Sequence, residues 1–180
     1  MKRDVGILLL LLLLIFAGCR SSLPPPKPQA ASAGQRRFEY PAAGIAFSYP
    51  SDWKPVPGSK SQLQVAAPAG GQLTLDVPVL PFHIPGWIPV DQVTSGYVDD
   101  FKKRMPDAVV TNLPDPTLPD ATQRRIKLAG HLNGKPAIDE AVLIVHNDKV
   151  YILAIDSDDK AYPRLHSALD AVLKSLQWTK

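Results

Sequence analysis

Three consecutive segments of apolar and β-branched residues constrain the fold of this chain most strongly. They cover Thr122–His131, Ala137–His146 and Val150–Asp156, and short turn signals join them in series. In the second and third segments apolar residues occupy both odd and even positions, as Val142 and Leu143 do, so both faces of each strand need cover. The sequence therefore predicts an α+β fold in which an antiparallel β-sheet is covered by helices on both faces.

Two turn signals set the register of these strands. Asn133-Gly134 supplies the positive-φ pair that a type I′ turn requires, and Asn147-Asp148 joins the second and third segments. With these pairs at the turn centres, Lys127 lies opposite Glu140, and Val142 lies opposite Leu153. We interpret Lys127 and Glu140 as a cross-strand surface pair rather than a catalytic one.

Two segments with helical periodicity are the predicted helices that cover the two faces of the sheet. The first has Asp91 as its predicted N-cap, and Pro106 stops it. The second closes the chain, with Asp158 or Asp159 as its cap and Pro163 in its first turn. The apolar stripes are Val93, Tyr97, Phe101 and Met105 in the first helix, and Leu165, Leu169, Val172, Leu173 and Leu176 in the second.

The remaining strands are shorter. Phe38–Tyr40 and Ile45–Tyr49 form a predicted hairpin around Pro41–Gly44, after which Trp53 turns onto the core. Leu63 and Val65 mark a further strand, and Leu73, Leu75 and Val77 mark the next one, with a turn at Gly70-Gly71 between them. Val109-Val110 is a short predicted strand, and Gln177-Trp178 ends the chain as a short strand or packed end.

The N-terminus has the pattern of a lipoprotein leader. A basic start precedes eleven apolar residues, Ile7–Ala17, which are too few to span a bilayer and typical of a signal peptide. Phe16-Ala17-Gly18-Cys19 resembles the lipobox of bacterial lipoproteins, which implies cleavage after residue 18 and a diacylglyceryl thioether on Cys19. The alternative is an ordinary secretory leader with an incidental cysteine. Arg20, rather than an aspartate, favours the outer membrane if the host has two membranes.

Residues 19–37 form a predicted tether between the lipidated cysteine and a single domain, residues 38–180. The tether contains one large apolar residue, Leu23, and the proline-rich run Pro24–Pro28, so it cannot bury enough surface to fold. The proline-rich run predicts a short polyproline II stretch. We interpret this part as a flexible spacer that holds the domain away from the lipid.

Composition excludes several functional classes. The formal net charge is +3, and removal of Lys2, Arg3 and Asp4 with the leader leaves 18 − 16 = +2. Such a balance does not suit a nucleic-acid-binding protein, which needs a concentrated basic surface. A single cysteine excludes an internal disulfide framework and a thiolate metal cage.

Two segments resemble the PsbP-like superfamily, which includes DcrB-type bacterial lipoproteins. Residues 44–54, Gly-Ile-Ala-Phe-Ser-Tyr-Pro-Ser-Asp-Trp-Lys, are similar to its opening hairpin, and Tyr162–Trp178 is similar to its final helix. The resemblance implies an α/β/α sandwich, in agreement with the pattern above. Its motifs are structural, so it implies no activity, and no binding residue is carried over.

No residue pattern indicates catalysis, a metal site or a cofactor. The four histidines, His83, His131, His146 and His166, lack metal-ligand spacing, and we interpret them as surface or loop-end residues. Asp156, Asp158 and Asp159 lack the glycine and distal glutamate of an EF-hand, so helix capping explains them better. Nucleophile and phosphate-binding motifs are absent. We therefore expect a protein that is not an enzyme and has no cofactor.

One proline-rich loop carries several large apolar side chains, namely Phe82, His83, Ile84, Trp87 and Ile88. The favoured interpretation is that they fold back over the sheet. The alternative is an exposed patch that binds a partner. The expected function is a lipid-anchored, extracytoplasmic accessory module that binds an envelope protein. The alternative function is a carrier or sensor of a small hydrophobic ligand, held between the sheet and this loop.

Overall fold

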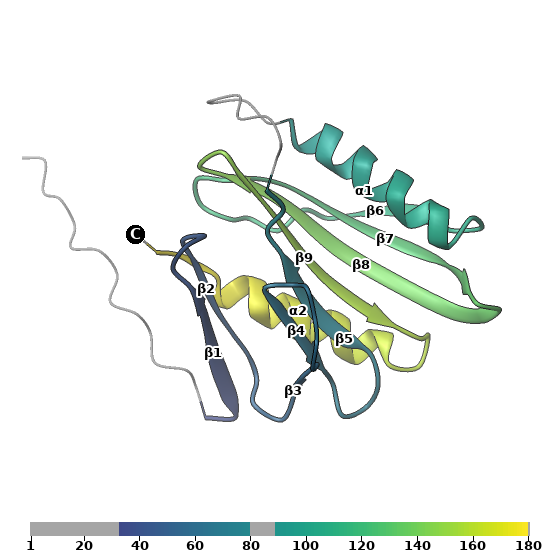
Figure 1. The fold of residues 1–180 in the computed structure, drawn as a ribbon, viewed down its shortest axis with the longest axis horizontal. Helices are drawn as coiled ribbons and strands as arrows, with labels where there is room; N and C mark the ends of the chain where they lie inside the picture. Colours follow the sequence, from purple (N-terminus) through teal and green to yellow (C-terminus); the bar gives the residue numbers. More distant parts are fainter. Residues whose placement is uncertain (1–32, 80–88, 180) are drawn as a thin grey trace, which may run out of the picture. The chain divides into compact units, whose positions relative to one another are not determined.

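Seven strands form one antiparallel sheet in the computed structural model, which describes residues 33–79 and 89–179 (Figure 1). Their spatial order is β3-β4-β5-β9-β8-β7-β6. The three longest strands are consecutive in the sequence, as predicted. The strands are β3 (Lys54–Pro55), β4 (Leu63–Ala66), β5 (Gln72–Asp76), β6 (Val109–Leu113), β7 (Thr122–Leu132), β8 (Lys135–His146) and β9 (Lys149–Ser157).

A smaller sheet contains the N-terminal hairpin and the end of the chain. β1 (Gln35–Tyr40) pairs with β2 (Ile45–Pro50), and β2 also pairs with β10 (Gln177–Trp178). The hairpin around Pro41–Gly44 is confirmed, and Gly44 takes a φ of 74° that favours glycine. The hairpin therefore pairs with the C-terminal strand and not with the seven-stranded sheet.

The predicted register of the central strands is confirmed. Lys127 faces Glu140 across β7 and β8, and Val142 faces Leu153 across β8 and β9. All four turn residues at 133–134 and 147–148 have positive φ. The turn chemistry thus fixes which side chains of β8 point to which face of the sheet.

Two helices cover opposite faces of the large sheet (Figure 1). α1 (Val90–Arg104) lies over β7 and β8, and α2 (Tyr162–Ser175) lies against β9 and β5 on the other face. The alternate residues of β8 divide between two cores: Val142 packs with the α2 residues, and Leu143 packs with the α1 residues. The predicted α+β fold with helices on both faces is confirmed.

The predicted caps of both helices are wrong. α1 begins at Val90 after Pro89, and no side chain caps it, whereas Asp91 lies inside the first turn and reaches Arg124. Pro89, in an extended conformation, is the cap residue, two residues earlier than predicted. The cap residue of α2 is Ala161, and no side chain caps that helix either; Asp158 instead accepts a hydrogen bond from the Ala161 amide at 2.8 Å in the turn before it.

The leader, Cys19, most of the tether and residues 80–88 lie outside the described residues. Among the described residues, neither helix combines the length and the apolar character needed to cross a membrane.

Candidate functional site

Two adjacent acids in the middle of β8 are buried on opposite faces of the sheet. Asp139 is 3% exposed on the α1 face, and Glu140 is fully buried on the α2 face. Burying a carboxylate is costly unless it is paired or protonated. The surroundings of these two residues therefore define the most unusual chemistry in the described part of the chain.

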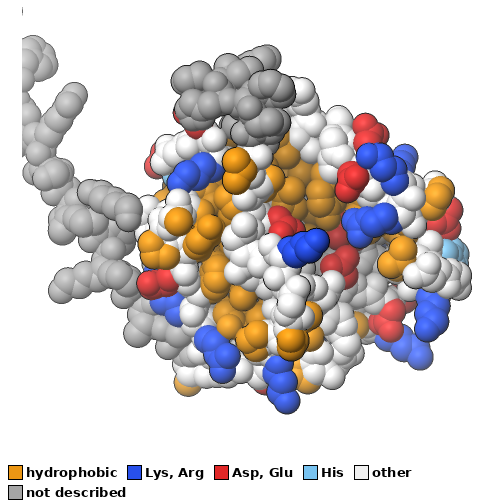
Figure 2. Space-filling model, in the orientation of Figure 1, with side chains coloured by type: hydrophobic (Ala, Val, Ile, Leu, Met, Phe, Trp, Pro, Cys, Tyr) orange, Lys and Arg blue, Asp and Glu red, His pale blue; other side chains and the backbone are white. Residues whose placement is uncertain are grey.

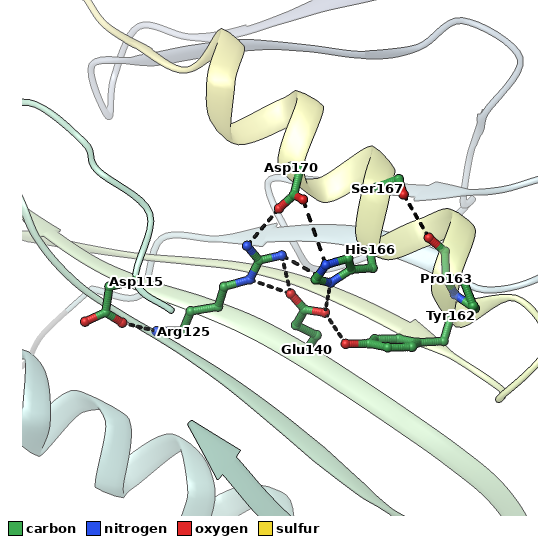
Figure 3. A network of polar contacts seen from close by, with 8 residues as sticks. All are labelled: Asp115, Arg125, Glu140, Tyr162, Pro163, His166, Ser167 and Asp170. Atoms are coloured by element: carbon green, nitrogen blue, oxygen red, sulfur yellow. Dashed lines mark hydrogen bonds and ion pairs between the residues drawn. The ribbon is translucent and has the colours of Figure 1, made fainter. Parts of the chain in front are cut away.

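Glu140 lies at the centre of a polar network on the α2 face (Figure 3). One of its oxygens is 2.5 Å from the Arg125 guanidinium. The other accepts a hydrogen bond from the Tyr162 hydroxyl at 2.7 Å and lies 2.8 Å from Nδ1 of His166. Both carboxylate oxygens thus have partners from β7 and α2.

Arg125 connects this network to a second acid. It pairs with Asp170 at 2.7 Å, and its own backbone amide donates to Asp115 at 2.8 Å. Burial lowers the pKa of Arg125, but the charges and hydrogen bonds of Glu140 and Asp170 outweigh that effect and raise it overall. The guanidinium therefore stays charged although its side chain is only 9% exposed.

Helical spacing brings the α2 residues of this network together. Tyr162, His166 and Asp170 follow one another at intervals of four, so they share one face of the helix. Burial and the hydrogen bond to Glu140 raise the pKa of the Tyr162 hydroxyl, which stays protonated and acts as a donor.

The His166 ring has no nucleophile to activate. It lies between Glu140 and Asp170, with Nε2 at 3.8 Å from the Asp170 carboxylate. Within residues 33–79 and 89–179, no serine, threonine or cysteine contacts the ring, and neighbouring Ser167 donates to the Pro163 carbonyl (Figure 3). General-base chemistry needs a proton donor within hydrogen-bond reach. The contacts in this network instead join α2 to β7 and β8.

Asp139 has a different environment on the α1 face. The Tyr97 hydroxyl of α1 donates to its two oxygens at 2.8 and 3.0 Å. Across the strand pair it faces Asp156, with which it shares a hydrogen bond. Burial, and then the charge of Asp156, raise the pKa of Asp139 well above its ordinary value. Its surroundings therefore favour the protonated form of this carboxyl group more than those of an exposed aspartate do.

A row of amides extends this pair across the sheet. Gln72 of β5 donates to Asp156 at 2.9 Å, and Gln64 of β4 donates to Gln72 at 2.7 Å. Tyr97, Asp139, Asp156 and the two glutamines thus form one chain of hydrogen bonds from α1 to β4. Each member has a partner from the next element, which fixes the orientation of Asp156.

A cavity of about 440 Å³ adjoins Asp156 at the end of the sheet. It lies between the last turn of α1, the β7–β8 hairpin and the connection from β9 to α2. A neighbouring depression of about 340 Å³ shares three of its residues. The cavity is lined by Gly71, Gln72, Phe101, Arg104, Met105, Leu132, Lys135, Pro136, Ala137, Ile138, Asp156, Ser157 and Asp158.

The described histidines have structural partners. His131 lies 2.8 Å from the Asp107 carboxylate, and hydrogen bonds from the His131 amide and ring lower the pKa of Asp107. His146 ends β8 directly before the turn at 147–148, as a loop-end residue, but it is 8% exposed and its ring stacks on that of Trp178 with centroids 3.8 Å apart, so it is not a surface residue. Among the described residues, no group of three or more acidic, histidine or cysteine side chains is placed to hold a metal ion.

The sequence-predicted sites and the observed clusters do not coincide. Cys19 and the apolar loop residues Phe82, His83, Ile84, Trp87 and Ile88 lie outside the described residues. The proposed surface pair of Lys127 and Glu140 is wrong, because Glu140 is fully buried and pairs with Arg125. The available signal, which the sequence analysis did not use, is two successive acids in a strand predicted to be buried on both faces.

Solved structures share this arrangement of sheet and helices. The solution structure of cyanobacterial PsbP (CyanoP) from Synechocystis sp. PCC 6803 matches with a TM-score of 0.58 and 14% identity, over 82% of this chain and 94% of that one. The fold is PsbP-like. A Bacteroides thetaiotaomicron crystal structure matches with a TM-score of 0.55 and 12% identity over 82% of this chain, which corresponds to 49% of that chain.

A third PsbP-like neighbour is LpqN of Mycobacterium tuberculosis, described as involved in cell envelope biogenesis. It matches with a TM-score of 0.51 and 18% identity, over 76% of this chain and 83% of that one. No family model matches this chain, and no curated protein matches it. At these identities the likeness concerns the fold alone.

On the face shown in Figure 2, acidic and basic side chains are interspersed and do not segregate by sign.

Proposed function

We propose that this chain is a lipid-anchored, extracytoplasmic accessory module that binds an envelope protein and has no enzymatic activity. The observation that carries the proposal is the sequence Phe16-Ala17-Gly18-Cys19 at the end of a short apolar run. A thioether-linked diacylglyceryl group on Cys19 supplies two acyl chains, which is what stable membrane attachment requires. Arg20 after the cysteine favours the outer membrane in a host with two membranes.

The rest of the N-terminal sequence suits such an anchor. Residues 20–37 are rich in proline, serine and alanine and contain only one large apolar residue, so they act as a spacer between lipid and domain. The PsbP-like fold of the domain is shared with LpqN, whose description places that protein in cell envelope biogenesis. That neighbour supports an envelope role for this chain.

The polar clusters of the domain support binding rather than catalysis. The Glu140 network satisfies its own members, and His166 contacts carboxylates and a guanidinium instead of a nucleophile. Asp139 accepts a hydrogen bond from Tyr97, and Asp156 accepts one from Gln72. Covalent catalysis by a hydrolase or transferase uses a nucleophilic side chain with a base in reach, and the described contacts of His166 are not of that kind. We therefore assign the module a binding role.

Intact-mass spectrometry of the chain purified from its own host tests the anchor. We expect a mass that lacks the first 18 residues and carries acyl groups on Cys19, and recovery of the protein in the membrane fraction. Cys19→Ala should abolish the added mass and the processing, whereas the matched change Ser21→Ala should leave both intact. A native chain that retains its leader, or an unmodified Cys19, contradicts the proposal.

A further inference from the structure

The cavity beside Asp156 has an apolar floor and an apolar wall that is open to solvent. Phe101, Met105 and Ile138 are each less than 8% exposed and form part of its lining. Leu132, on the β7–β8 hairpin, also lines it and is 41% exposed, one of the few large apolar side chains exposed in the described residues. The volume of about 440 Å³ lies within the range of small-molecule sites.

The acids of this cavity already have hydrogen-bond donors within the protein. Asp156 accepts a hydrogen bond from Gln72 at 2.9 Å and is hydrogen-bonded to Asp139, which it faces across the strand pair. Asp158 accepts a bond from the Ala161 amide at the start of α2. The carboxylates that border the cavity are thus engaged in fixing the β9–α2 connection.

The cations of the cavity are not paired with a carboxylate among the described residues. Arg104 and Lys135 are both exposed, and in the described part of the chain neither lies within ion-pair distance of a carboxylate. The Arg104 guanidinium lies 4.6 Å from the centroid of the Phe101 ring, so it is positioned directly beside the apolar floor. Arg104 also acts at longer range on the charge of Asp139, but within the described residues neither cation forms an ion pair, and the two flank an apolar depression.

We propose that this cavity binds a small amphiphile with an anionic head group and a short apolar body. Arg104 and Lys135 bind the head group, and Leu132 with the floor residues contacts the apolar body. Charge-assisted hydrogen bonds from a guanidinium suit carboxylate and phosphate oxygens equally well. The inference concerns the folded domain and does not depend on the lipid anchor or on an envelope partner.

Binding of eight-carbon probes to the full chain tests the inference. The purified full chain is titrated with each probe by isothermal titration calorimetry in the presence of lipid nanodiscs, whether or not the chain carries the lipid. A titration with empty nanodiscs removes the contribution of probe partitioning. Octanoate and octyl phosphate represent a free acid and a lipid-like phosphate, while octylammonium and octyl glucoside share the apolar body with a cationic or neutral head. We expect saturable binding of one or both anionic probes and none of the other two.

Charge-removing variants separate this site from general adsorption. Arg104→Gln and Lys135→Gln should each weaken binding of the anionic probe by about tenfold, the effect of losing one charge-assisted contact. The matched change Lys102→Gln removes the same charge from the same helix, away from the cavity, and should leave affinity unchanged. Equal binding of octanoate and octylammonium overturns the proposal. So does undiminished affinity in both cavity variants, or no saturable binding above empty nanodiscs.

Discussion

Asp139 and Glu140 are neighbours in the sequence and are both buried, but their carboxyl groups have different partners on the two faces of the sheet. Glu140 is paired with Arg125 and also contacts Tyr162 and His166, so its charge is compensated. Asp139 has one hydroxyl donor and a second acid opposite it, and burial and the charge of Asp156 raise its pKa well above the ordinary value. The cost of burying a carboxylate is thus offset by a countercharge on the α2 face, and is reduced by the raised pKa of the acid on the α1 face.

The difference extends to how each helix is attached. α2 contributes three side chains to the Glu140 network, in addition to its apolar stripe. α1 has the hydrogen bond from Tyr97 and an exposed ion pair between Asp91 and Arg124 at 2.8 Å. The hydroxyl of Thr94 donates back to the carbonyl of Val90 within the helix and not to the sheet. We infer that α2 is held by buried charge in addition to apolar packing, whereas α1 is held by apolar packing and the hydrogen bond from Tyr97.

Removing the cation of the α2 face should have the largest effect. Arg125→Met leaves Glu140 buried without its countercharge, and breaking a buried pair by removing one partner costs about 3–5 kcal/mol. We expect that loss in the free energy of unfolding, measured by urea denaturation at pH 7 with tryptophan fluorescence.

The adjacent Arg124 provides the matched control. Its ion pairs with Asp91 and Asp115 involve a side chain that is 43% exposed. Exposed pairs contribute little, so Arg124→Met should cost less than about 1 kcal/mol. Similar losses for the two arginine variants would show that the Glu140 network carries no special stability and would remove the contrast between the two faces.

Asp139 on the α1 face should make the stability of the domain depend on pH. Because its pKa is raised in the folded state, its stabilising contribution is complete below the unfolded pKa of about 4 and is lost as the pH rises through the folded pKa. In that window the folded state binds more protons, so the free energy of unfolding falls by up to about 1.4 kcal/mol per pH unit.

Asp139→Asn should remove this dependence, because the amide keeps a partner for Tyr97 and carries no charge at any pH. Urea midpoints measured between pH 4 and pH 9 should fall more steeply for the wild type than for the variant, and the variant should be the more stable at high pH. The exposed residue Asp99, changed to Asn, serves as the control and should reproduce the wild-type profile. Parallel profiles for wild type and Asp139→Asn would mean that Asp139 is ionised in the folded protein.

Most of the fold was predictable because its signals are local. The turn pairs at 133–134 and 147–148 fixed the register, and the mixed parity of β8 demanded two covering helices. The placement of the first hairpin in a separate sheet was not predictable, since it depends on the distant pairing of Ala46 with Gln177.

The sequence allows the burial and register of the acids in the polar clusters to be predicted, but not their partners. Burial of both Asp139 and Glu140 follows from the predicted double cover of β8, and the correct register even placed Lys127 opposite Glu140. The residue that pairs with Glu140 is Arg125, which lies two residues before Lys127 on the same face of β7. Side-chain reach and the position of α2 decide between the two cations, and neither has a signature in the local sequence.

The smallest effects should come from the two tyrosines that donate to these acids. Tyr162→Phe removes a donor from the ion-paired Glu140, and hydrogen bonds to charged groups contribute about 1.5–3 kcal/mol. Tyr97→Phe removes a donor from the protonated Asp139, a neutral contact expected to contribute about 1 kcal/mol. Both changes keep the aromatic ring, so urea denaturation at pH 6 compares the hydroxyl groups directly. A larger loss for Tyr97→Phe would indicate that Asp139 carries the buried charge and that the assignment of the two faces is reversed.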